Sequence, residues 1–333
     1  MIVVTGAAGF IGSCLTARLL SDLHADLVLV DDFSPPAKQR NLEEKHPSLR
    51  IDRDLFLPWL SKCKNQVELV FHLGARTDTT ELNPRIFDSL NLGFSQALWN
   101  ACADAGIPLI YASSAATYGD GRHGYQDDHT CVPLLHPLNP YGVSKNTFDH
   151  WALRKSGLLP DPDNLAPAAP PFWAGLKFFN VYGPNEYHKS RMASVVFHTF
   201  RQIQTTGTMR LFRSHRPDVP DGHQQRDFIY VRDVVDILRF LQDNPSVPNG
   251  LYNVGTGSAR TFLDLATLTF LAMDREPAIH FVDTPADIRH TYQYFTEADM
   301  RKLQQTGYAG PRYSLESGIL EYVRDFLLPD KCW

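Results

Sequence analysis

Short apolar runs alternate along the chain with longer stretches whose apolar positions recur at helical spacing. The short runs predict strands at residues 1–5, 26–32, 49–52, 68–73, 107–113, 173–179 and 251–254. The helical spacing predicts helices around residues 11–21, 84–105, 140–156, 191–206, 231–243, 261–273 and 314–327. This alternation predicts an α/β protein built on a doubly wound parallel sheet.

Three glycines, Gly6, Gly9 and Gly12, follow the first strand and lead into a helix. Such glycines permit a tight turn, a close approach of a pyrophosphate to the backbone, and close packing of helix on strand. The spacing is two residues and then two, unlike the usual one and then two. The second strand ends in Asp31 and Asp32, about 20 residues on, where a carboxylate binds an adenosine ribose. Together these features predict a Rossmann-type dinucleotide-binding fold.

Tyr141 and Lys145 are one helical turn apart, so they lie on one face of a predicted helix. An ammonium beside a phenol lowers the phenol pKa from about 10 toward the working pH, which produces a phenolate base. Asn139 before Pro140 predicts the start of this helix, because these residue types favour the N-cap and the first helical position. Taken alone, the pair is also compatible with a partly buried tyrosine and a surface lysine.

These motifs resemble the extended short-chain dehydrogenase/reductase superfamily, and within it the sugar-nucleotide epimerases. The resemblance covers nearly the whole chain, and its most specific segments are residues 111–119, 179–184, 188–194, 226–230 and 292–296. The His-Lys-x-x-Met-Ala-Ser run resembles epimerases that act at C-6 of an ADP-activated heptose, a precursor of bacterial lipopolysaccharide. The resemblance implies an isomerase that oxidises its substrate transiently and returns the hydride to the other face.

The same resemblance implies four catalytic residues. Tyr141 is expected to exchange a proton on one face of the substrate, and Lys189 on the other. Ser114, at the end of a parallel strand, is expected to hydrogen-bond the substrate oxygen, with Ser113 as the competing position. Lys145 is expected to lower the phenol pKa and to bond the nicotinamide ribose. Without the matching motif, Lys189 would be interpreted as a solvated loop lysine.

A nicotinamide cofactor is implied, and NADP is expected because the family prefers it. Its 2′-phosphate requires cations, for which Lys38, Arg40 and Arg53 are candidates, whereas Asp32 beside Asp31 adds a negative charge that favours NAD. His72 is equally compatible with a hydrogen-bonded core histidine, and Asn91 with a solvent-facing helix residue. The expected cofactor contacts are Gly6, Gly9, Phe10, Ile11, Gly12, Asp31, Asp32, Lys38, Arg53, Leu73, Gly74, Ala75, Arg76, Asn91, Lys145, Val181 and Lys189.

The substrate contacts that the resemblance implies are Ser114, Asn180, Arg191, His198, Phe212, Arg213, Ser214, His215, Arg226 and Tyr292. Arg226 suits a diphosphate because its guanidinium is a planar fork of donors. Arg226 and Asp227 are equally compatible with a structural ion pair. Arg191, the run at residues 212–215 and the long loop at residues 214–223 depart from better-known members of the family, which leaves the exact sugar open.

Two domains are expected to share the chain. The dinucleotide-binding domain is expected at residues 1–179 and about 227–257, and a smaller, discontinuous α/β substrate-binding domain at about 180–226 and 258–333. The proline-rich segment at residues 157–171 predicts a surface loop.

Two other functions compete with the heptose reaction. One is a different sugar-nucleotide epimerase, such as a UDP-hexose 4-epimerase, and the other is a non-catalytic dinucleotide sensor. The intact Ser114, Tyr141 and Lys145 disfavour a sensor. Ala115 and Ala116 disfavour a dehydratase, because that branch has an Asp-Glu pair at these positions.

Composition excludes further classes of protein. A chain of 333 residues with net charge −5 has no basic surface for nucleic acid, and no apolar run approaches the roughly 20 residues of a membrane span. The first residues predict a core strand and not a signal peptide, and five widely spaced cysteines show no pairing or metal pattern. We therefore expect a cytoplasmic homo-oligomer that acts on a small-molecule sugar nucleotide, without metal, nucleic-acid or membrane partners.

Overall fold

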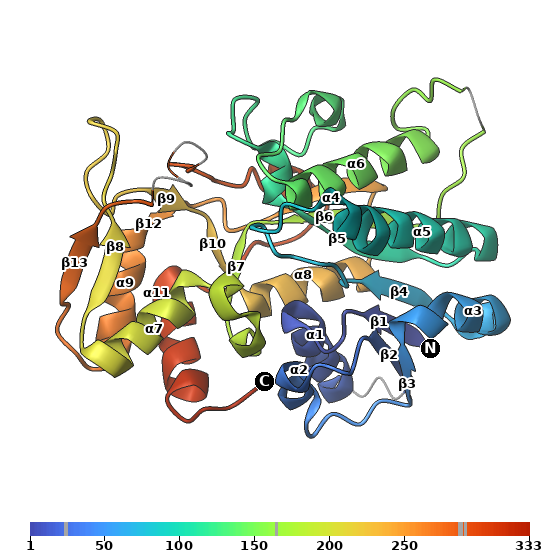
Figure 1. The fold of residues 1–333 in the computed structure, drawn as a ribbon. Helices are drawn as coiled ribbons and strands as arrows, with labels where there is room; N and C mark the ends of the chain where they lie inside the picture. The colour runs from blue at the N-terminus through green and yellow to red at the C-terminus, as the bar shows by residue number, and fades with distance from the viewer. Residues whose placement is uncertain (23–25, 164–165, 286–288, 290–291) are drawn as a thin grey trace.

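The computed structural model describes residues 1–22, 26–163, 166–285, 289 and 292–333. At its centre is a seven-stranded parallel sheet with the strand order β11-β6-β5-β4-β1-β2-β3 (Figure 1). The predicted α/β class and doubly wound sheet are confirmed, and each of the seven predicted strands lies in this sheet. The strands are β1 (Ile2–Thr5), β2 (Leu27–Asp31), β3 (Leu49–Asp52), β4 (Leu69–His72), β5 (Leu109–Ser114), β6 (Trp173–Phe178) and β11 (Gly250–Val254).

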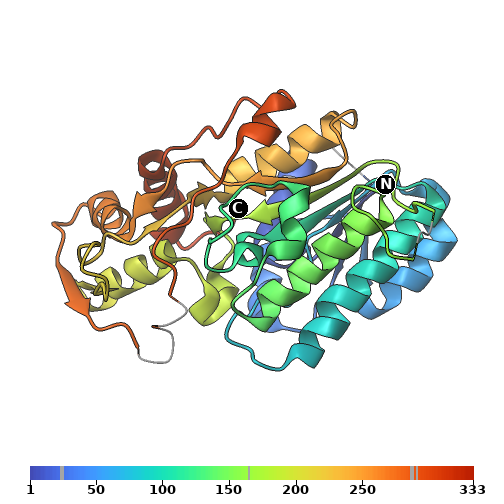
Figure 2. The same cartoon turned by 90° about the horizontal axis from the view of Figure 1, so that it is seen from above.

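Helices cover both faces of the sheet, as Figure 2 shows from above. One face carries α1 (Phe10–Ser21) and α8 (Val231–Asp243), and the other carries α3 (Arg53–Cys63), α5 (Phe94–Ala105) and α6 (Pro140–Lys155). Neighbouring strand residues therefore enter different cores: Val4 and Leu29 pack with α1 and α8, whereas Val3 and Val28 pack with the other helices. Burial on both faces explains why β1 and β2 are almost entirely apolar.

The order of the strands reverses at β1. The chain places β2 and β3 on one side of β1, and then β4, β5, β6 and β11 on the other side. In open parallel sheets, ligands bind in the crevice outside the carboxyl ends of the strands at such a reversal. The ends of β1 and β4 are therefore the expected floor of a binding site.

A smaller α/β group lies beside the large sheet, on the left in Figure 1. Ile203, Leu211 and Phe270 belong to a small core of its own. The helices of this group are α7 (Val195–Thr206), α9 (Phe262–Ala272) and α11 (Leu315–Glu321), whereas α10 (Arg301–Gln305) contacts β11 of the large sheet through Lys302. Its strand pairs are β8 (Met209–Phe212) with β13 (Ile279–Val282), β9 (Gln225–Arg226) with β12 (Arg260–Thr261), and β7 (Asn180–Tyr182) with β10 (Phe228–Tyr230). The residue bounds of the two domains stay a prediction.

The start of α6 follows its prediction. Asn139 is the N-cap, its side-chain oxygen accepts a hydrogen bond from the Gly142 backbone N–H at 2.8 Å, and Pro140 is the first helical residue. A side-chain cap of this kind satisfies a backbone donor that the first helical turn leaves free. Tyr141 and Lys145 therefore lie in the first two turns of a well-defined helix.

Several helices differ from their predictions. The predicted helix over 84–105 consists of α4 (Pro84–Phe87), a π-helical turn (Asp88–Gly93) and α5. The predicted helix over 191–206 begins only at Val195, because the Ser194 hydroxyl caps it and a 3₁₀ segment precedes it. The helix predicted over 314–327 is α11 followed by a π-helical turn (Tyr322–Leu327). A short helix, α2 (Pro36–Gln39), was not predicted.

The proline-rich segment at residues 157–171 contains no helix or strand in its described parts, and residues 164–165 lie outside the described residues. Its described parts therefore agree with the predicted loop. Within the described residues, no helix has the length and apolar character that crossing a bilayer requires.

Candidate active site

The glycine turn after β1 touches the end of β4. Gly6 has a φ of +68°, and a Cβ added there would lie 2.6 Å from the Gly74 Cα, so a side chain is excluded both by conformation and by space. A Cβ on Gly12 would collide with the Gly6 carbonyl oxygen. Gly9 is the N-cap of α1, which brings the positive end of that helix to the crevice. A turn of this kind can hold an anionic group against backbone N–H donors.

A cavity of about 660 Å³ lies above this turn. Every expected cofactor contact lines it except Asn91, Lys145 and Val181. The structure thus brings residues of the glycine turn, the end of β2, the loop after β4 and Lys189 into one pocket. Sequence reasoning missed other lining residues, including Thr77, Asp78, Leu90, Phe94, His188 and Met192. His188 and Met192 belong to the same motif as Lys189, which was the available signal, whereas the other four carry no local pattern.

The carboxylates at the end of β2 already have partners. Asp31 accepts hydrogen bonds from the backbone N–H groups of Ala8 and Asp32, each at 2.8 Å, and pairs with the Lys38 ammonium at 2.9 Å. The Ser34 hydroxyl and backbone N–H donate to Asp32 and lower its pKa. The pocket therefore combines two carboxylates with a lysine that is committed to one of them.

The other candidate cations are also paired. Arg53 lines the pocket and contacts Asp54 at 3.1 Å. Arg40 does not line it and pairs with Asp330 at 2.9 Å. Local charge in the structure thus gives no simple preference for a 2′-phosphate or for a free ribose hydroxyl.

The Ser114 hydroxyl lies close enough to the Tyr141 phenol to influence the phenol pKa. Burial raises the pKa of Tyr141, and the Ser114 hydroxyl opposes that shift. Lys145 Nζ donates to the Ala112 carbonyl oxygen at 2.7 Å, and burial lowers the pKa of Lys145 to about 8. The expected lowering of the phenol pKa is therefore wrong for this structure, because desolvation dominates at the phenol and the lysine is directed to the backbone of β5.

Asn91 supports this region instead of lining the pocket. Its side chain accepts from the Arg76 backbone N–H at 2.8 Å and donates to the Arg76 carbonyl oxygen at 3.0 Å and to Ser144 Oγ at 3.1 Å. It therefore connects the loop after β4 to α6. Because Asn91 is buried, its alternative interpretation as a solvent-facing polar residue is wrong.

His72 is a hydrogen-bonded core histidine. Its ring nitrogens contact Thr5 Oγ1 at 2.7 Å and Ser95 Oγ at 2.9 Å, and burial lowers its pKa to about 3. A neutral imidazole with both nitrogens bonded has no free group for substrate chemistry. This confirms the structural alternative that its sequence context left open.

Lys189 lies on the wall of the cofactor pocket and not in solvent. Its Nζ stands 5.4 Å from the centroid of the Phe10 ring, beside the glycine turn. Burial lowers the pKa of Lys189, and the buried Glu186 one turn earlier opposes that shift. A half-buried lysine with a lowered pKa is suited to proton exchange.

Arg226 is buried without a carboxylate partner among the described residues. Its guanidinium donates to the Gln225 and Gln293 carbonyl oxygens and lies 5.5 Å from the Phe262 ring centroid and 5.6 Å from that of Tyr292. The alternative ion pair with Asp227 is absent among the described salt bridges. Burial lowers the pKa of Arg226. A desolvated guanidinium with no acidic partner is suited to bind an anion.

Asp227 instead has a structural role. Its carboxylate accepts hydrogen bonds from Thr256, Gly257 and Ala298. It therefore holds the turn after β11 and leaves its neighbour Arg226 available.

Some of the remaining predicted substrate contacts gather near Arg226. The Phe212 ring lies 6.2 Å from that of Tyr292, and Tyr292 lies 5.6 Å from Tyr294. Tyr294 in turn accepts a hydrogen bond from the His215 backbone N–H at 2.9 Å. This aromatic group places the run at residues 212–215 beside the buried guanidinium.

Arg213 and Ser214 are committed to the loop itself. Arg213 pairs with Asp283 at 3.3 Å, and the backbone N–H of Ser214 donates to Asp221 at 2.8 Å. These contacts hold the loop at residues 214–223 against β13. Neither side chain is bound to the buried guanidinium.

The other predicted substrate contacts lie elsewhere. Arg191 contacts Asp78 at 3.4 Å, across the loops beside the cofactor pocket, and its carbonyl oxygen is 3.3 Å from His198 Nε2. Asn180 is exposed on β7 and its backbone N–H donates to the Asp227 carbonyl oxygen at 3.0 Å, while Val181 is half-buried on the same strand. The structure therefore assembles one pocket, one Ser-Tyr-Lys group and one Arg-aromatic group.

Comparison with known proteins agrees with this arrangement. The model of the NAD dependent epimerase/dehydratase family matches residues 2–255. Proteins named ADP-L-glycero-D-manno-heptose-6-epimerase are 43% identical to the chain in Fusobacterium nucleatum and 46% in Nitratidesulfovibrio vulgaris strain Hildenborough, over 98% of both chains in each case.

Solved structures give the same picture at lower identity. The Helicobacter pylori ADP-L-glycero-D-manno-heptose-6-epimerase is 26% identical, with a TM-score of 0.76 over 97% of this chain and 95% of that one. The Thermotoga maritima UDP-glucose 4-epimerase with UDP-glucose is 25% identical, with a TM-score of 0.74 over 98% of this chain and 99% of that one.

Proposed function

The chain belongs to the NAD dependent epimerase/dehydratase family, and on that premise we propose that it inverts C-6 of ADP-D-glycero-D-manno-heptose to give the L-glycero epimer. The observation that carries this substrate is the identity of 43% and 46% with two heptose-6-epimerases over 98% of the chain. The family match alone supports only an epimerase or dehydratase that uses a nicotinamide dinucleotide.

The pocket above the glycine turn fits such a cofactor. Gly6, Gly9 and the first turn of α1 would hold its pyrophosphate, and Asp31 would face its adenosine ribose. When bound, the nicotinamide supplies the chemistry of accepting a hydride from C-6 and returning it. The protein residues then have to move one proton at the C-6 oxygen and orient the substrate.

Tyr141 takes the proton of the C-6 hydroxyl as one epimer is oxidised, and in the reverse direction it returns a proton to that same epimer. The Ser114 hydroxyl lies beside the phenol and donates its one proton to the same C-6 oxygen, which holds that oxygen next to Tyr141. Once the cofactor and substrate are bound, the Lys145 ammonium favours the phenolate by its charge. Because burial raises the pKa of Tyr141, we propose that the phenolate forms only when substrate and cofactor bind.

Lys189 serves the opposite face of C-6. After oxidation the carbonyl turns within the site, and hydride addition to its other face needs a proton at an oxygen that now points away from Tyr141. A half-buried lysine beside the glycine turn suits that role because its ammonium has protons to give and its pKa is lowered by burial.

Arg226 is proposed to bind the diphosphate of the sugar nucleotide. Its guanidinium is buried, unpaired with any carboxylate among the described residues, and surrounded by the rings of Phe262 and Tyr292. The nearby Phe212 ring could extend an aromatic wall for the adenine. Arg191, His198, Asn180 and the 213–215 run stay proposals for sugar contacts.

NADP is the proposed cofactor, with weak discrimination against NAD. Lys38 supports a 2′-phosphate, but it is bound to Asp31, and ionised Asp32 repels the added charge. Asp32→Asn should therefore shift preference toward NADP. Fluorescence titration of cofactor-free enzyme with both dinucleotides measures this, and a wild-type preference for NAD that Asp32→Asn leaves unchanged would show that Asp32 does not control selectivity.

The setting of the reaction is also a proposal. We assign the enzyme to the cytoplasmic synthesis of the lipopolysaccharide core, expect a homo-oligomer, and retain the domain bounds of 1–179 with about 227–257 and about 180–226 with 258–333. Light scattering on the purified protein measures the oligomeric state.

The test of the function is an NMR assay of purified protein with ADP-D-glycero-D-manno-heptose and, separately, with UDP-glucose. We expect the L-glycero heptose to accumulate to equilibrium and UDP-glucose to stay unchanged. Conversion of UDP-glucose alone would replace this proposal by the 4-epimerase alternative.

A further inference from the structure

Tyr141, Lys145 and Asp149 follow one another at successive turns of α6, so they lie on one face of that helix. This face contacts the last residues of β5, residues 112–114, which include the candidate catalytic serine. Two of the three helix residues have a proposed role in proton exchange. The third, Asp149, is fully buried and has no role in the mechanism above.

Asp149 fixes the side of β5 that packs against α6. Ser113 Oγ donates to Asp149 Oδ2 at 2.6 Å, and the Tyr111 hydroxyl donates to Asp149 Oδ1 at 3.0 Å. Tyr111 and Ser113 are two residues apart on a strand and so point to the same side. The carboxylate thus holds the strand directly before Ser114.

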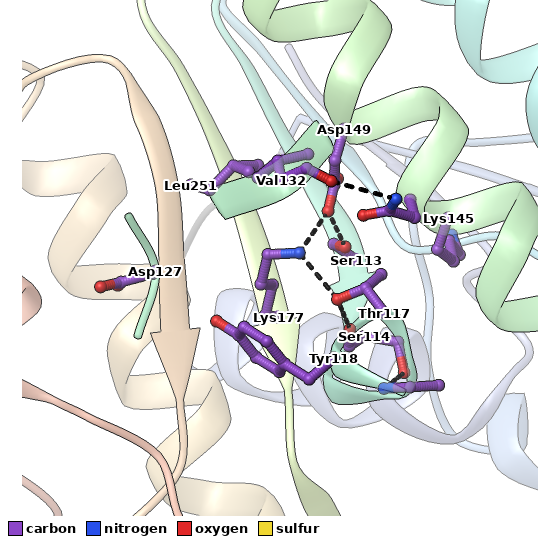
Figure 3. Close-up of polar contacts among 12 residues, drawn as sticks. Ser113, Ser114, Thr117, Tyr118, Asp127, Val132, Lys145, Asp149, Lys177 and Leu251 are labelled. Carbon is purple, nitrogen blue, oxygen red and sulfur yellow. Dashed lines mark hydrogen bonds and ion pairs between the residues drawn. The ribbon is translucent and has the colours of Figure 1, made fainter. Parts of the chain in front are cut away.

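Lys177 of β6 balances the charge of Asp149. Its Nζ lies 2.7 Å from Asp149 Oδ2, and both side chains are 0% exposed. The same ammonium donates to Thr117 Oγ1 at 2.7 Å, and the Thr117 hydroxyl donates to the Ser114 carbonyl oxygen at 2.8 Å (Figure 3). A buried ion pair with its remaining donors and acceptors satisfied behaves as one unit, because removing either partner leaves an uncompensated charge.

A second cation is close enough in sequence to compete for Asp149. Lys145 is one helical turn before it, the spacing at which opposite charges pair on a helix. In the structure Asp149 binds Lys177, and Lys145 donates to the Ala112 carbonyl oxygen. Lys177 therefore takes the place that Lys145 would otherwise occupy.

We propose that Lys177 is a positioning residue that occupies Asp149, keeps Lys145 out of an ion pair, and holds the backbone of Ser114 through Thr117. Lys177 is fully buried and does not act on the substrate itself. The inference rests on the proposed function, in which Ser114, Tyr141 and Lys145 serve one face of the sugar.

The charge of Asp149 also reaches Lys145. Burial lowers the pKa of Lys145 to about 8, and the Asp149 carboxylate opposes that shift. Lys145 must be protonated to favour the phenolate, so activity should decline as pH rises through about 8. The other titratable groups that face these lysines are Tyr141 of α6, His72 of β4, Tyr111 of β5, and Tyr118, His129 and Lys302.

Two substitutions should move this alkaline limb of the pH–activity profile in opposite directions. Lys177→Met leaves Asp149 free to pair with Lys145, which raises the pKa of Lys145. The alkaline limb of the pH–activity profile then moves to a higher pH than in the wild type, and kcat falls roughly 100-fold with little change in KM. Asp149→Asn removes the carboxylate that opposes burial, so the limb moves below pH 8. A merely structural defect lowers activity without opposite shifts.

A double variant and a matched control sharpen the test. Lys177→Met/Asp149→Asn has no unpaired carboxylate to capture Lys145, so at pH 6.5 its kcat should exceed that of Lys177→Met by roughly tenfold. Lys302→Met is the control, since Lys302 is a half-buried lysine that donates to the Asp127 and Leu251 carbonyl oxygens. It should lower thermal stability and leave the alkaline limb where it is.

The readout that separates this inference from the proposed function is the titration of Lys145 itself. Protein labelled with ¹³C at lysine Cε, with the signal assigned from Lys145→Met, gives the pKa without any turnover. We expect about 8 in the wild type, a higher value in Lys177→Met and a lower value in Asp149→Asn. If the three proteins titrate in this way but the wild type shows no epimerase activity, only the proposed function is contradicted.

The opposite outcomes overturn the positioning role. If folded Lys177→Met titrates at Lys145 like the wild type, or if the double variant is no faster than the single one, Lys177 only supports the fold. Should Lys177→Met not fold, the Asp149→Asn titration decides, and a pKa of Lys145 unchanged from the wild type refutes the inference.

Discussion

The phenol of Tyr141 is the residue on which the mechanism depends most. Tyr141→Phe removes the proton acceptor and should lower the rate by about 10²–10⁴-fold, with fold and cofactor binding retained. Tyr308→Phe is a matched control, because the Tyr308 hydroxyl is buried and has no hydrogen-bond partner among the described residues. Epimerisation of the heptose, followed by NMR, measures both. Near-wild-type turnover by Tyr141→Phe contradicts the assignment.

Lys189 distinguishes an epimerase from a dehydrogenase that works on one face. Lys189→Met keeps the length of the side chain but has no proton to exchange, so epimerisation should fall by at least about 10²-fold. Dinucleotide binding should persist, which titration of the stripped enzyme measures. Lys62→Met, at an exposed lysine of α3, is the control. Normal epimerisation by Lys189→Met would leave this lysine with a binding role only.

Sequence patterns identified these residues but not their electrostatics. The helical spacing of Tyr141 and Lys145 held, yet the phenol pKa rises, because the burial of the phenol and the direction of the ammonium depend on tertiary packing. Likewise, Arg226 had two open interpretations, and the contacts of Asp227 with the turn after β11 count against the ion pair, while the substrate role stays a prediction. Lys177 carries no local motif at all.

At the scale of elements, the turn after β1 makes a clear prediction. Gly6 and Gly106 share a φ of +68°, but a Cβ at Gly6 meets Gly74 whereas one at Gly106 meets nothing within 4 Å. Gly106→Ala should therefore cost only the conformational term of about 1–2 kcal/mol. Gly6→Ala should lower the melting temperature further and weaken dinucleotide binding by at least about tenfold. Equal effects of the two substitutions in calorimetry and titration would refute a close contact between β1 and β4.

The elements themselves were predictable where their patterns were strong. The seven strands of the sheet were all predicted, and most are rich in apolar residues, although the edge strand β3 reads Leu-Arg-Ile-Asp and is largely exposed. Helix α3 was missed because Pro58 inside it is ordinarily a break signal, although Asp52 caps it by accepting from the Asp54 backbone N–H. The pairs of β7, β8 and β9 with distant strands were also missed, because a local pattern does not reveal a partner strand far along the chain.

At the scale of the whole molecule, three groups serve the proposed reaction. They are a dinucleotide pocket at the strand reversal, Ser114 at the end of β5 with Tyr141 and Lys145 on α6, and an Arg-aromatic group in the smaller α/β part. A single hydride leaves C-6 and returns to it, while protons are exchanged only at oxygen. This division predicts where isotope from the solvent enters the product.

The most direct test of the central claim is therefore the reaction of the wild-type enzyme with ADP-D-glycero-D-manno-heptose in D₂O, followed by NMR. We predict conversion to the L-glycero epimer with protium retained at C-6, because the hydrogen removed as hydride is the one returned. Deuterium at C-6 of the product, or a heptose that stays unchanged, would contradict inversion by transient oxidation at that carbon.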